Sequence, residues 1–583
     1  MEYIYDGWGK EIEEYQAHNG YVDEQSTPSV QYTYDDGAVS GVAAYLRLTD
    51  VVYPNGREVG YNYAAGVDSI MSRLTSIFED GNGNGILDPD ETVDSAYKYL
   101  GLNQIVEEDD AAAKLTYLNS DGTNVTGLDR FGRVADQIWE NYDASPTVFD
   151  HYSYEYDRAG NVTSKANVLD TSLSETYQYD ALDRLTSWSV GGTTQKTWSY
   201  DSLGNNVSTA TGGTYNSANE ETAIVGNAVT PTYDAAGNMT TLSSGGTAVY
   251  DAWNRLVSVT ATPQAGEQVV STYSYDGVGR RVQEVVDTSC QEPPLWSESA
   301  EDDYYAGQQV VETRDAGGDV QYQYLWSPRY TDAPILRDTY QTVDGQQSIA
   351  LPQRVFYLAD ANYNVTGLLK YDSGSGTWQA AERYTYTPYG AVTYRNADWT
   401  TASSSANNNT ILYTGRTLDL STGLYYYRAR YYDAVLERFI NRDPIGYKGG
   451  INLYEYVGNA PLTHSDPDGR CPIAPVIIGG TIAIGCAYWA TGCTPGATRL
   501  ATYCASCVRL CFIIDPAWWQ GLYDPQWGTY EYQQYEICMR NVPGIGRGTW
   551  YPSMNPRTTL TVPCNAAPCP AGTVDKGIKY YSF

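Results

Sequence analysis

The chain has 583 residues, a net charge of −34, and 56 tyrosines against seven phenylalanines. This length predicts several domains or one repetitive structure. The acidic charge argues against a nucleic-acid-binding surface on the body of the chain, because phosphate recognition needs basic groups. Glycine and proline are near their average shares, which argues against a collagen-like or disordered chain. Tyrosine favours strands, so the composition predicts an all-β repeat protein.

The chain opens with Met1-Glu2-Tyr3, followed by strand-like sequence. The basic and apolar regions of a secretory signal are not found there. Two interpretations stay open: the sequence starts inside a longer protein, or export uses another route.

The segment from Asp80 to Glu91 matches the twelve-residue calcium-binding loop position by position. The candidate ligands are Asp80, Asn82, Asn84, the carbonyl of Ile86, Asp88 and Glu91. The flanks, residues 72–77 and 96–99, look like strands and not like the helices of an EF-hand. We therefore expect a single calcium loop (80–91) inserted in a hairpin. The alternative is an acidic turn without metal.

A pattern of Tyr-Asp followed by Gly, Asn or Asp four residues after the tyrosine recurs between residues 156 and 280. Its tyrosines are Tyr156, Tyr179, Tyr200, Tyr233, Tyr250 and Tyr275. Each copy predicts a strand, a turn capped by the aspartate, and a returning strand that starts with an apolar residue. The residue four positions after the tyrosine is one that tolerates a positive φ. Because one hairpin cannot bury its own face, neighbouring copies should stack into a continuous sheet.

These motifs resemble the YD repeat of the Rhs, Tc-toxin and teneurin families. Weaker copies lie upstream, at Tyr34-Asp35 and at Leu128-Asp129. The resemblance implies that residues 1–414 form antiparallel hairpins wound into a shell or barrel-like spiral sheet. Six clear copies are few for a closed shell, so a partner chain or preceding sequence would be needed to complete one.

Residues 415–470 contain a long ordered motif that includes Tyr-Tyr-Tyr-Arg-Ala-Arg-Tyr-Tyr-Asp and ends in Ser-Asp-Pro-Asp-Gly-Arg. The motif resembles the Rhs repeat-associated core, which ends the shell in that family. In toxin members the core is an internal aspartyl protease that cuts after a terminal Asp-Pro-x-Gly-Leu stretch. By this resemblance Asp443, its neighbour Arg442, and Asp466 are the catalytic candidates. The cut would fall between Arg470 and Cys471.

Arg470 departs from the family pattern, which has leucine or another apolar residue before the cut. A charged side chain suits an apolar subsite poorly. This favours a second interpretation, in which both aspartates only cap the turns before Pro444 and Pro467 and the tail stays attached.

The tail, residues 471–583, holds nine of the ten cysteines and carries a net charge of +2, whereas residues 1–470 carry −36. Dense cysteines in a short segment predict disulfides in an exported, oxidising setting, with a zinc site as the alternative. The apolar stretch 472–490 is near the minimum length for a membrane span, but its prolines and glycines favour a packed hairpin. The tail has no histidine, which excludes His-dependent hydrolysis and HNH metal sites there.

Two functions remain. The first is a secreted or cell-surface bacterial shell that encloses or presents a variable C-terminal domain, as in polymorphic toxins. The second is a non-enzymatic surface adhesion protein with a disulfide-stapled terminal module. The one enzymatic activity that the sequence indicates is self-cleavage by the core. The tail contains no recognisable catalytic set, and its activity and target are unknown.

Overall fold

The computed structural model describes residues 1–470, except 19, 36–46, 65, 120–121, 123, 144–145, 262–267, 290–295, 344–345 and 349–352. Beyond residue 470 it describes two paired strands, β38 (Glu531–Tyr535) and β39 (Ile578–Ser582). The chain divides into two compact units, Met1–Ala483 and Ile484–Phe583. The tail cysteines lie outside the described residues, so the predicted disulfides, zinc site and apolar hairpin of the tail do too.

Two long antiparallel sheets make up most of the first unit, as predicted, and consecutive strands are neighbours in both. The first sheet contains β1 (Glu2–Tyr5), β2 (Glu11–Tyr15), β3 (Ser29–Tyr34), β4 (Leu48–Val52), β5 (Glu58–Asn62), β6 (Ser76–Glu79), β7 (Val93–Leu100), β8 (Gln104–Asp110), β9 (Lys114–Thr116), β10 (Asp136–Glu140), β11 (Val148–Tyr156), β12 (Val162–Asn167), β13 (Glu175–Tyr179), β14 (Leu185–Val190) and β15 (Thr193–Thr197). The pair β16 (Gly213–Tyr215) and β17 (Glu221–Ile224) follows it.

The second sheet contains β18 (Thr232–Tyr233), β19 (Met239–Thr241), β20 (Thr247–Tyr250), β21 (Leu256–Ala261), β22 (Gln268–Tyr275), β23 (Arg281–Ser289), β24 (Trp296–Ala306), β25 (Gln309–Asp315), β26 (Val320–Trp326), β27 (Pro334–Thr339), β30 (Arg354–Ala359), β31 (Val365–Asp372), β32 (Thr377–Tyr386) and β33 (Val392–Asn396). The small pair β28 (Gln341–Val343) and β29 (Gln346–Ser348) lies within it in sequence. Helical elements in the described residues are short: α1 (Val67–Met71), η1 (Thr171–Leu173), η3 (Tyr413–Gly415), η4 (Gly446–Lys448) and η5 (Val457–Asn459). None of these helices is long and apolar enough to cross a membrane.

Each Tyr-Asp motif forms the turn that the sequence predicts. In the copy around Asp180, the carboxylate accepts the backbone N–H groups of Leu182 and Arg184 at 2.9 and 3.1 Å. The residue four positions after the tyrosine has a positive φ in all six copies; its φ is 61° at Asp183 and 62° at Asn254. Glycine, asparagine and aspartate are the residues that adopt this conformation at least cost, which explains the composition of the motif.

In five of the six copies the tyrosine hydroxyl donates to the preceding hairpin, whereas the Tyr233 hydroxyl accepts the backbone N–H of Glu221 at 3.1 Å. The hydroxyl of Tyr179 donates to the carbonyl oxygen of Val162 at 2.7 Å, and that of Tyr275 donates to Leu256 at 2.6 Å. In each case the acceptor is the apolar residue that starts the returning strand of the preceding copy. Tyr156, Tyr200 and Tyr250 make the same bond, to Val134, Leu185 and Met239. A phenylalanine would remove this hydrogen bond, which favours tyrosine over phenylalanine at these five positions.

Arginine in the turn adds a second link between neighbouring copies. The guanidinium of Arg184 lies 4.8 Å from the ring centroid of Tyr200, the tyrosine of the next copy. Arg255 lies at the same distance from the ring of Tyr275. Each of these cation–π contacts joins one hairpin to the next hairpin in the sequence.

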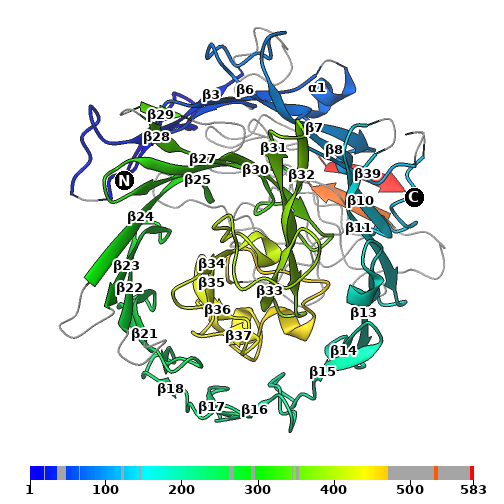
Figure 1. Cartoon of the computed structure of the whole chain (residues 1–583), viewed down its shortest axis with the longest axis vertical. Helices are drawn as coiled ribbons and strands as arrows, with labels where there is room; N and C mark the ends of the chain where they lie inside the picture. Colours follow the sequence, from blue (N-terminus) through cyan, green and yellow to red (C-terminus); the bar gives the residue numbers. More distant parts are fainter. Residues whose placement is uncertain are drawn as a thin grey trace. The chain divides into compact units, whose positions relative to one another are not determined.

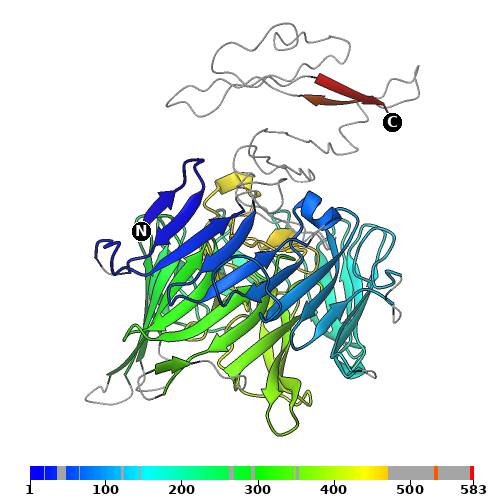
Figure 2. The same ribbon diagram turned by 90° about the horizontal axis from the view of Figure 1, so that it is seen from above.

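Strands far apart in sequence lie side by side, because the second sheet packs against the first. The side-chain amide of Gln16 bonds both backbone groups of Tyr305, at 2.6 and 2.9 Å. Further along, Arg354 of β30 pairs with Asp94 of β7 at 2.8 Å. Figure 1 shows the strands following one another around a ring, and Figure 2 shows the blue N-terminal strands beside the green strands of the second sheet.

A four-stranded core sheet lies inside this ring (Figure 1). Its strands are β34 (Thr417–Asp419), β35 (Leu424–Tyr427), β36 (Arg430–Asp433) and β37 (Arg438–Phe439). Aromatic rings fill its centre: Tyr427, Tyr432, Phe439 and Tyr456 are fully buried. The core also bonds to turns of the wall, since the Tyr454 hydroxyl donates to the Gly237 carbonyl at 2.7 Å. The core sheet therefore lies within the ring of wall strands and shares one compact unit with them.

Candidate functional site

The hairpin β35–β36 places Arg430 at the centre of the candidate site. Residues 428 and 429 form the turn, and Tyr427 pairs with Arg430 across it. The Arg430 guanidinium lies 3.5 Å from the ring centroid of Phe439, and only 3% of the residue is exposed. Its Nη1 donates to the Leu453 carbonyl at 3.2 Å. A buried guanidinium held in this way is fixed both in position and in orientation.

Asp443 and Asp466, the two carboxylates expected from the sequence, meet at this arginine. Nη2 of Arg430 lies 3.3 Å from Oδ2 of Asp443 and 2.9 Å from Oδ2 of Asp466. Both aspartates are buried, with 9% and 1% of their surface exposed. Burial raises the pKa of Asp443 to about 6, although Arg430 acts in the opposite direction and Asp466 adds to the rise. Two neighbouring carboxyls of which one holds a proton below about pH 6 can act as an acid and a base.

Both aspartates also cap turns, as the second interpretation predicts. Oδ1 of Asp443 accepts the backbone N–H of Ile445 at 2.9 Å. Oδ1 of Asp466 accepts the backbone N–H of Arg470, also at 2.9 Å. In each carboxylate one oxygen caps the turn and the other faces Arg430. Turn capping and acid–base chemistry are thus compatible at these two residues.

The carbonyl of the expected cleavage bond and the Asp443 carboxylate both lie near Gly449. A Cβ atom built on Gly449 would lie 2.5 Å from Oδ2 of Asp443 and 3.4 Å from the carbonyl oxygen of Arg470. Both oxygens therefore border the same small space, which the missing side chain of Gly449 leaves open. Cys471, on the other side of this bond, lies outside the described residues.

Arg442, the third expected residue, is not brought to the carboxylates. Its Nη2 pairs with Oε1 of Glu220 at 2.7 Å, and its Nε donates to the Tyr454 hydroxyl at 3.2 Å. Arg442 and Asp443 are neighbours in sequence, but their side chains contact different groups. Sequence reasoning missed Arg430, although the Tyr-Tyr-Tyr-Arg-Ala-Arg stretch that contains it was part of the recognised motif.

Arg470 and Asp468 add charge next to this pair. Burial and the charge of Asp466 raise the pKa of Asp468 to about 6, whereas Arg470 and Arg428 work against the rise. The charged residue before the expected cut thus has an acidic neighbour two positions earlier in the chain. The charge of Arg470 acts on Asp468, and an apolar residue at position 470 would lack this electrostatic interaction.

The calcium-type loop connects β6 to β7, so it lies in a hairpin as expected. The carboxylate of Asp80 accepts the backbone N–H groups of Gly83 and Gly85 at 2.7 and 2.6 Å. Glu91 accepts those of Gly81 and Asp88, at 3.1 and 2.9 Å, and thereby joins the two ends of the loop. The amide nitrogens of Asn82 and Asn84 both donate to Oδ2 of Asp88. The Ile86 N–H donates to Asn84. Among the described residues, no three His, Cys, Asp or Glu side chains are grouped as a metal site.

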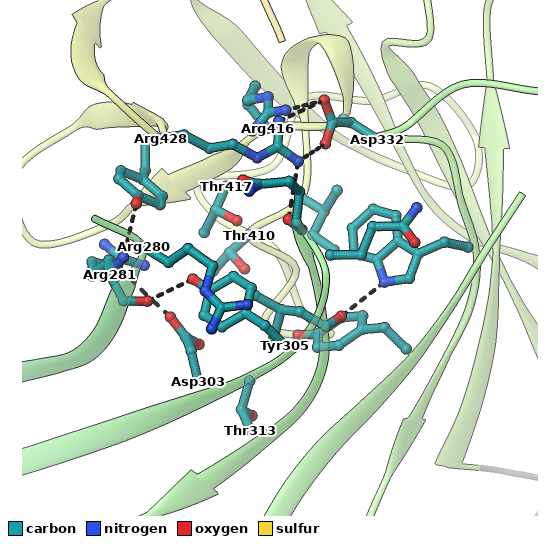
Figure 3. A pocket seen from close by; sticks show the side chains of 18 of the residues that line it. Arg280, Arg281, Asp303, Tyr305, Thr313, Asp332, Thr410, Arg416, Thr417 and Arg428 are labelled. Carbon is teal, nitrogen blue, oxygen red and sulfur yellow. Dashed lines mark hydrogen bonds and ion pairs between the residues drawn. The ribbon is translucent and has the colours of Figure 1, made fainter. Parts of the chain in front are cut away.

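A cavity of about 60 Å³ lies between the core and the wall (Figure 3). Four arginines line it together with Asp303 and Asp332: Arg280, Arg281, Arg416 and Arg428. Asp332 pairs with both Arg416 and Arg428, and Oδ1 lies 2.7 Å from Nη2 of Arg428. This volume holds about two water molecules. The ionic lining of this cavity joins the core to the wall.

Known proteins share both the sequence pattern and the fold. Residues 109–291 match the family model described as teneurin YD-shell. Double-stranded DNA deaminase toxin A of Burkholderia cenocepacia (strain H111) is 26% identical over 362 residues, which are 58% of this chain and 23% of that protein. Toxin subunit YenC1 of Yersinia entomophaga is 30% identical over 246 residues, 41% of this chain and 24% of that subunit. The chain thus spans about a quarter of the length of these relatives.

Solved structures show the same fold at lower sequence identity. The crystal structure of TcdB2-TccC3-Cdc42 superposes with a TM-score of 0.58 at 20% identity, over 80% of this chain and 23% of that one. The Tc holotoxin pore of Photorhabdus luminescens gives a TM-score of 0.55 at 19% identity, over 82% and 24%.

A wall of stacked Tyr-Asp hairpins around a buried core sheet defines the class of YD-repeat shells. Residues 109–291 of this chain match the model of such a shell, and the chain has the fold of the solved shells. It is similar to the shells of Tc toxins and to toxins of the Rhs type.

Proposed function

We propose that this chain is the closing part of a secreted bacterial shell that encloses or presents its variable C-terminal segment, as polymorphic toxins do. The observation that carries the proposal is the core sheet, which lies inside the hairpin ring and bonds to the turns of the wall through Tyr454. The names of the relatives, a toxin subunit and a deaminase toxin, support a role in toxin delivery. A further chain or preceding sequence would complete the shell.

Protection from protease tests this proposal. The full-length Asp443→Asn protein, which keeps the tail attached, is treated with proteinase K, and the survival of residues 471–583 is followed by mass spectrometry. An enclosed tail survives as long as the wall does, and denaturant that opens the wall exposes it. A tail digested long before the wall contradicts enclosure and favours the adhesion function, in which the terminal module is displayed outside.

The same core is proposed to release the tail by cutting the Arg470–Cys471 bond. In this reaction one carboxylate takes a proton from water, whose oxygen attacks the Arg470 carbonyl carbon. The other carboxyl donates its proton to the leaving amide nitrogen, so the products are a carboxyl group and a free amine. The pair Asp443 and Asp466 supplies both groups, and the Arg470 carbonyl and the Asp443 carboxylate both lie near Gly449. Intact-mass analysis of the expressed protein should find a fragment that begins at Cys471. The Asp443→Asn and Asp466→Asn proteins should lack it.

Calcium binding by the loop 80–91 is a further part of the proposal. Its support is the donor set, which consists of hard oxygen atoms in the order of a calcium loop, and the closed form of the loop between β6 and β7. A bound cation would require the amides of Asn82 and Asn84 to turn their oxygens toward Asp88 and the ion. Calcium would fix this hairpin and would have no part in the cleavage reaction.

A further inference from the structure

Arg428 occupies a position that is costly for its residue type. It lies in the two-residue turn between β35 and β36 with a φ of 56°. Glycine or asparagine would adopt this left-handed conformation with less strain. The side chain of Arg428 must therefore contribute something that the turn itself does not need.

That side chain joins the wall to the segment before the expected cut. On the wall, Nη2 lies 2.7 Å from Oδ1 of Asp332 and donates to the Gln308 carbonyl at 3.1 Å. On the core, Nη1 donates to the carbonyl oxygen of Pro467. Figure 3 shows Arg428 and Arg416 reaching the same carboxylate of Asp332.

The boundary segment brings a carboxyl group, Asp468, close to two arginines of this site. Two guanidinium groups, of Arg416 and Arg428, share the single carboxylate of Asp332. Burial and the charge of Arg428 lower the pKa of Arg416 to about 9, and burial also lowers the pKa of Arg428. The Asp468 carboxylate is one of the negative charges that oppose this on Arg428. The Arg428 guanidinium thus interacts with the Pro467 carbonyl and with the charge of Asp468.

We propose that Arg428, held by Asp332 of the wall, is a positioning residue that sets the register of residues 467–470 on the carboxylate pair of the core. This inference rests on the proposed cleavage of the Arg470–Cys471 bond and adds that cleavage depends on the contact between core and wall. Arg428 does not touch the reacting atoms and acts through the Pro467 carbonyl.

Two further hydrogen bonds hold the next two residues of the boundary segment against the β35–β36 hairpin. The backbone N–H of Ala429 donates to the Asp468 carbonyl at 3.3 Å, and Nε of Arg430 donates to the Gly469 carbonyl at 2.6 Å. Three successive carbonyls are therefore bound by three successive residues of the hairpin. A Cβ at position 469 would collide with the Tyr427 carbonyl oxygen, so only glycine fits there. If residues 467–470 shifted by one position, a residue with a side chain would replace Gly469 and would collide with the Tyr427 carbonyl oxygen.

The first arm of the test measures self-cleavage in the full chain. Arg428→Ala and Asp332→Asn should lower the rate of appearance of the fragment beginning at Cys471 by at least tenfold, and Arg428→Lys should fall between them and the wild type. Lys196→Gln is the matched control, because Lys196 forms another ion pair between wall and core, with Glu437 at 2.7 Å, and does not contact residues 467–470. Rates equal to that of the control overturn the proposal.

The second arm separates this inference from the cleavage reaction itself. In the Asp443→Asn background no self-cleavage is expected, and trypsin can be used to probe the bond after Arg470. Adding Arg428→Ala should speed tryptic release of the fragment beginning at Cys471 by tenfold or more, whereas adding Lys196→Gln should not. If the wild type never cleaves itself, the release function fails, but this measurement still decides the positioning role. Equal tryptic rates in the two double variants overturn it.

Discussion

The carboxylates of Asp443 and Asp466 meet at one nitrogen atom, Nη2 of Arg430, at 3.3 and 2.9 Å. The shared arginine keeps two buried acidic groups close together without requiring both to be protonated. A catalytic pair of aspartates normally avoids the repulsion of two charges by sharing one proton. Here the guanidinium lies within ion-pair distance of both carboxylates and offsets part of their repulsion. In the proposed cleavage, a proton on the pair would go to the leaving group.

Self-cleavage should slow as the pH rises above about 6. Burial raises the pKa of Asp443 to about 6, so this carboxyl is protonated below that pH and loses its proton above it. If Asp443 is the proton donor, its reactive form falls about tenfold for each pH unit above the pKa. The rate of fragment release, measured in quenched time courses from pH 5 to pH 8, should follow this decline. If the rate is constant or rises over this range, Asp443 is not the proton donor and another group supplies the proton.

Replacement of Arg430 should separate folding from cleavage. Arg430→Lys keeps a positive charge beside the two carboxylates but cannot bond Gly469, Leu453 and the carboxylates together. We expect this variant to fold and to cleave at least tenfold more slowly. Arg430→Met leaves two buried carboxylates without a counter-charge, which costs about 3–5 kcal/mol and should lower the unfolding temperature of the core. Circular dichroism and intact-mass analysis measure the two effects; wild-type cleavage in both variants would exclude a role for Arg430.

Calcium should bind once, at the loop 80–91. Calorimetry on the full chain should detect a single site that is lost in Glu91→Ala, because Glu91 closes the loop through Gly81 and Asp88. At a hundredfold excess over the dissociation constant, binding should stabilise the hairpin by about 2.7 kcal/mol. Asp372→Ala is the control, since Asp372 caps another glycine-rich hairpin tip through the N–H of Gly374. If calorimetry detects no heat of calcium binding to the wild type, the loop is an acidic turn without metal.

Removal of one tyrosine hydroxyl should weaken one junction between hairpins. Tyr179→Phe deletes the 2.7 Å bond to the Val162 carbonyl and should cost about 1–3 kcal/mol, because that carbonyl loses its partner. Hydrogen exchange should rise locally in β12 and β13. Tyr5→Phe serves as the comparison, as Tyr5 belongs to a similar motif but is 56% exposed. Equal exchange in the two variants would mean that the hydroxyl bond contributes little.

Local patterns predicted the parts of the structure that depend on local chemistry. The positive φ at Asp183 and Asn254, the capping by Asp180, and the hairpin around the calcium-type loop all follow from residue type and spacing. The same turn also forms at Asn216, where asparagine replaces aspartate. It forms at Asp6 as well, where the full pattern was present and could have been found.

The long-range partners could not be predicted in this way. Arg354 pairs with Asp94, which lies far from it in the sequence. Arg442 pairs with Glu220 and not with its sequence neighbour Asp443. Such pairs depend on how far the sheet curves in each turn of the wall, a property summed over many hairpins. The resemblance supplied Asp443 and Asp466, but only the folded core showed that Arg430 joins them.

The bonds from Tyr179 to Val162 and from Arg184 to Tyr200 connect each hairpin to its immediate neighbour alone. A duplicated hairpin would therefore find both of its contacts already provided by the copies on either side. Gene duplication could lengthen such a wall one hairpin at a time, provided that the turns bonded to the closing core, such as that of Gly237, keep their places.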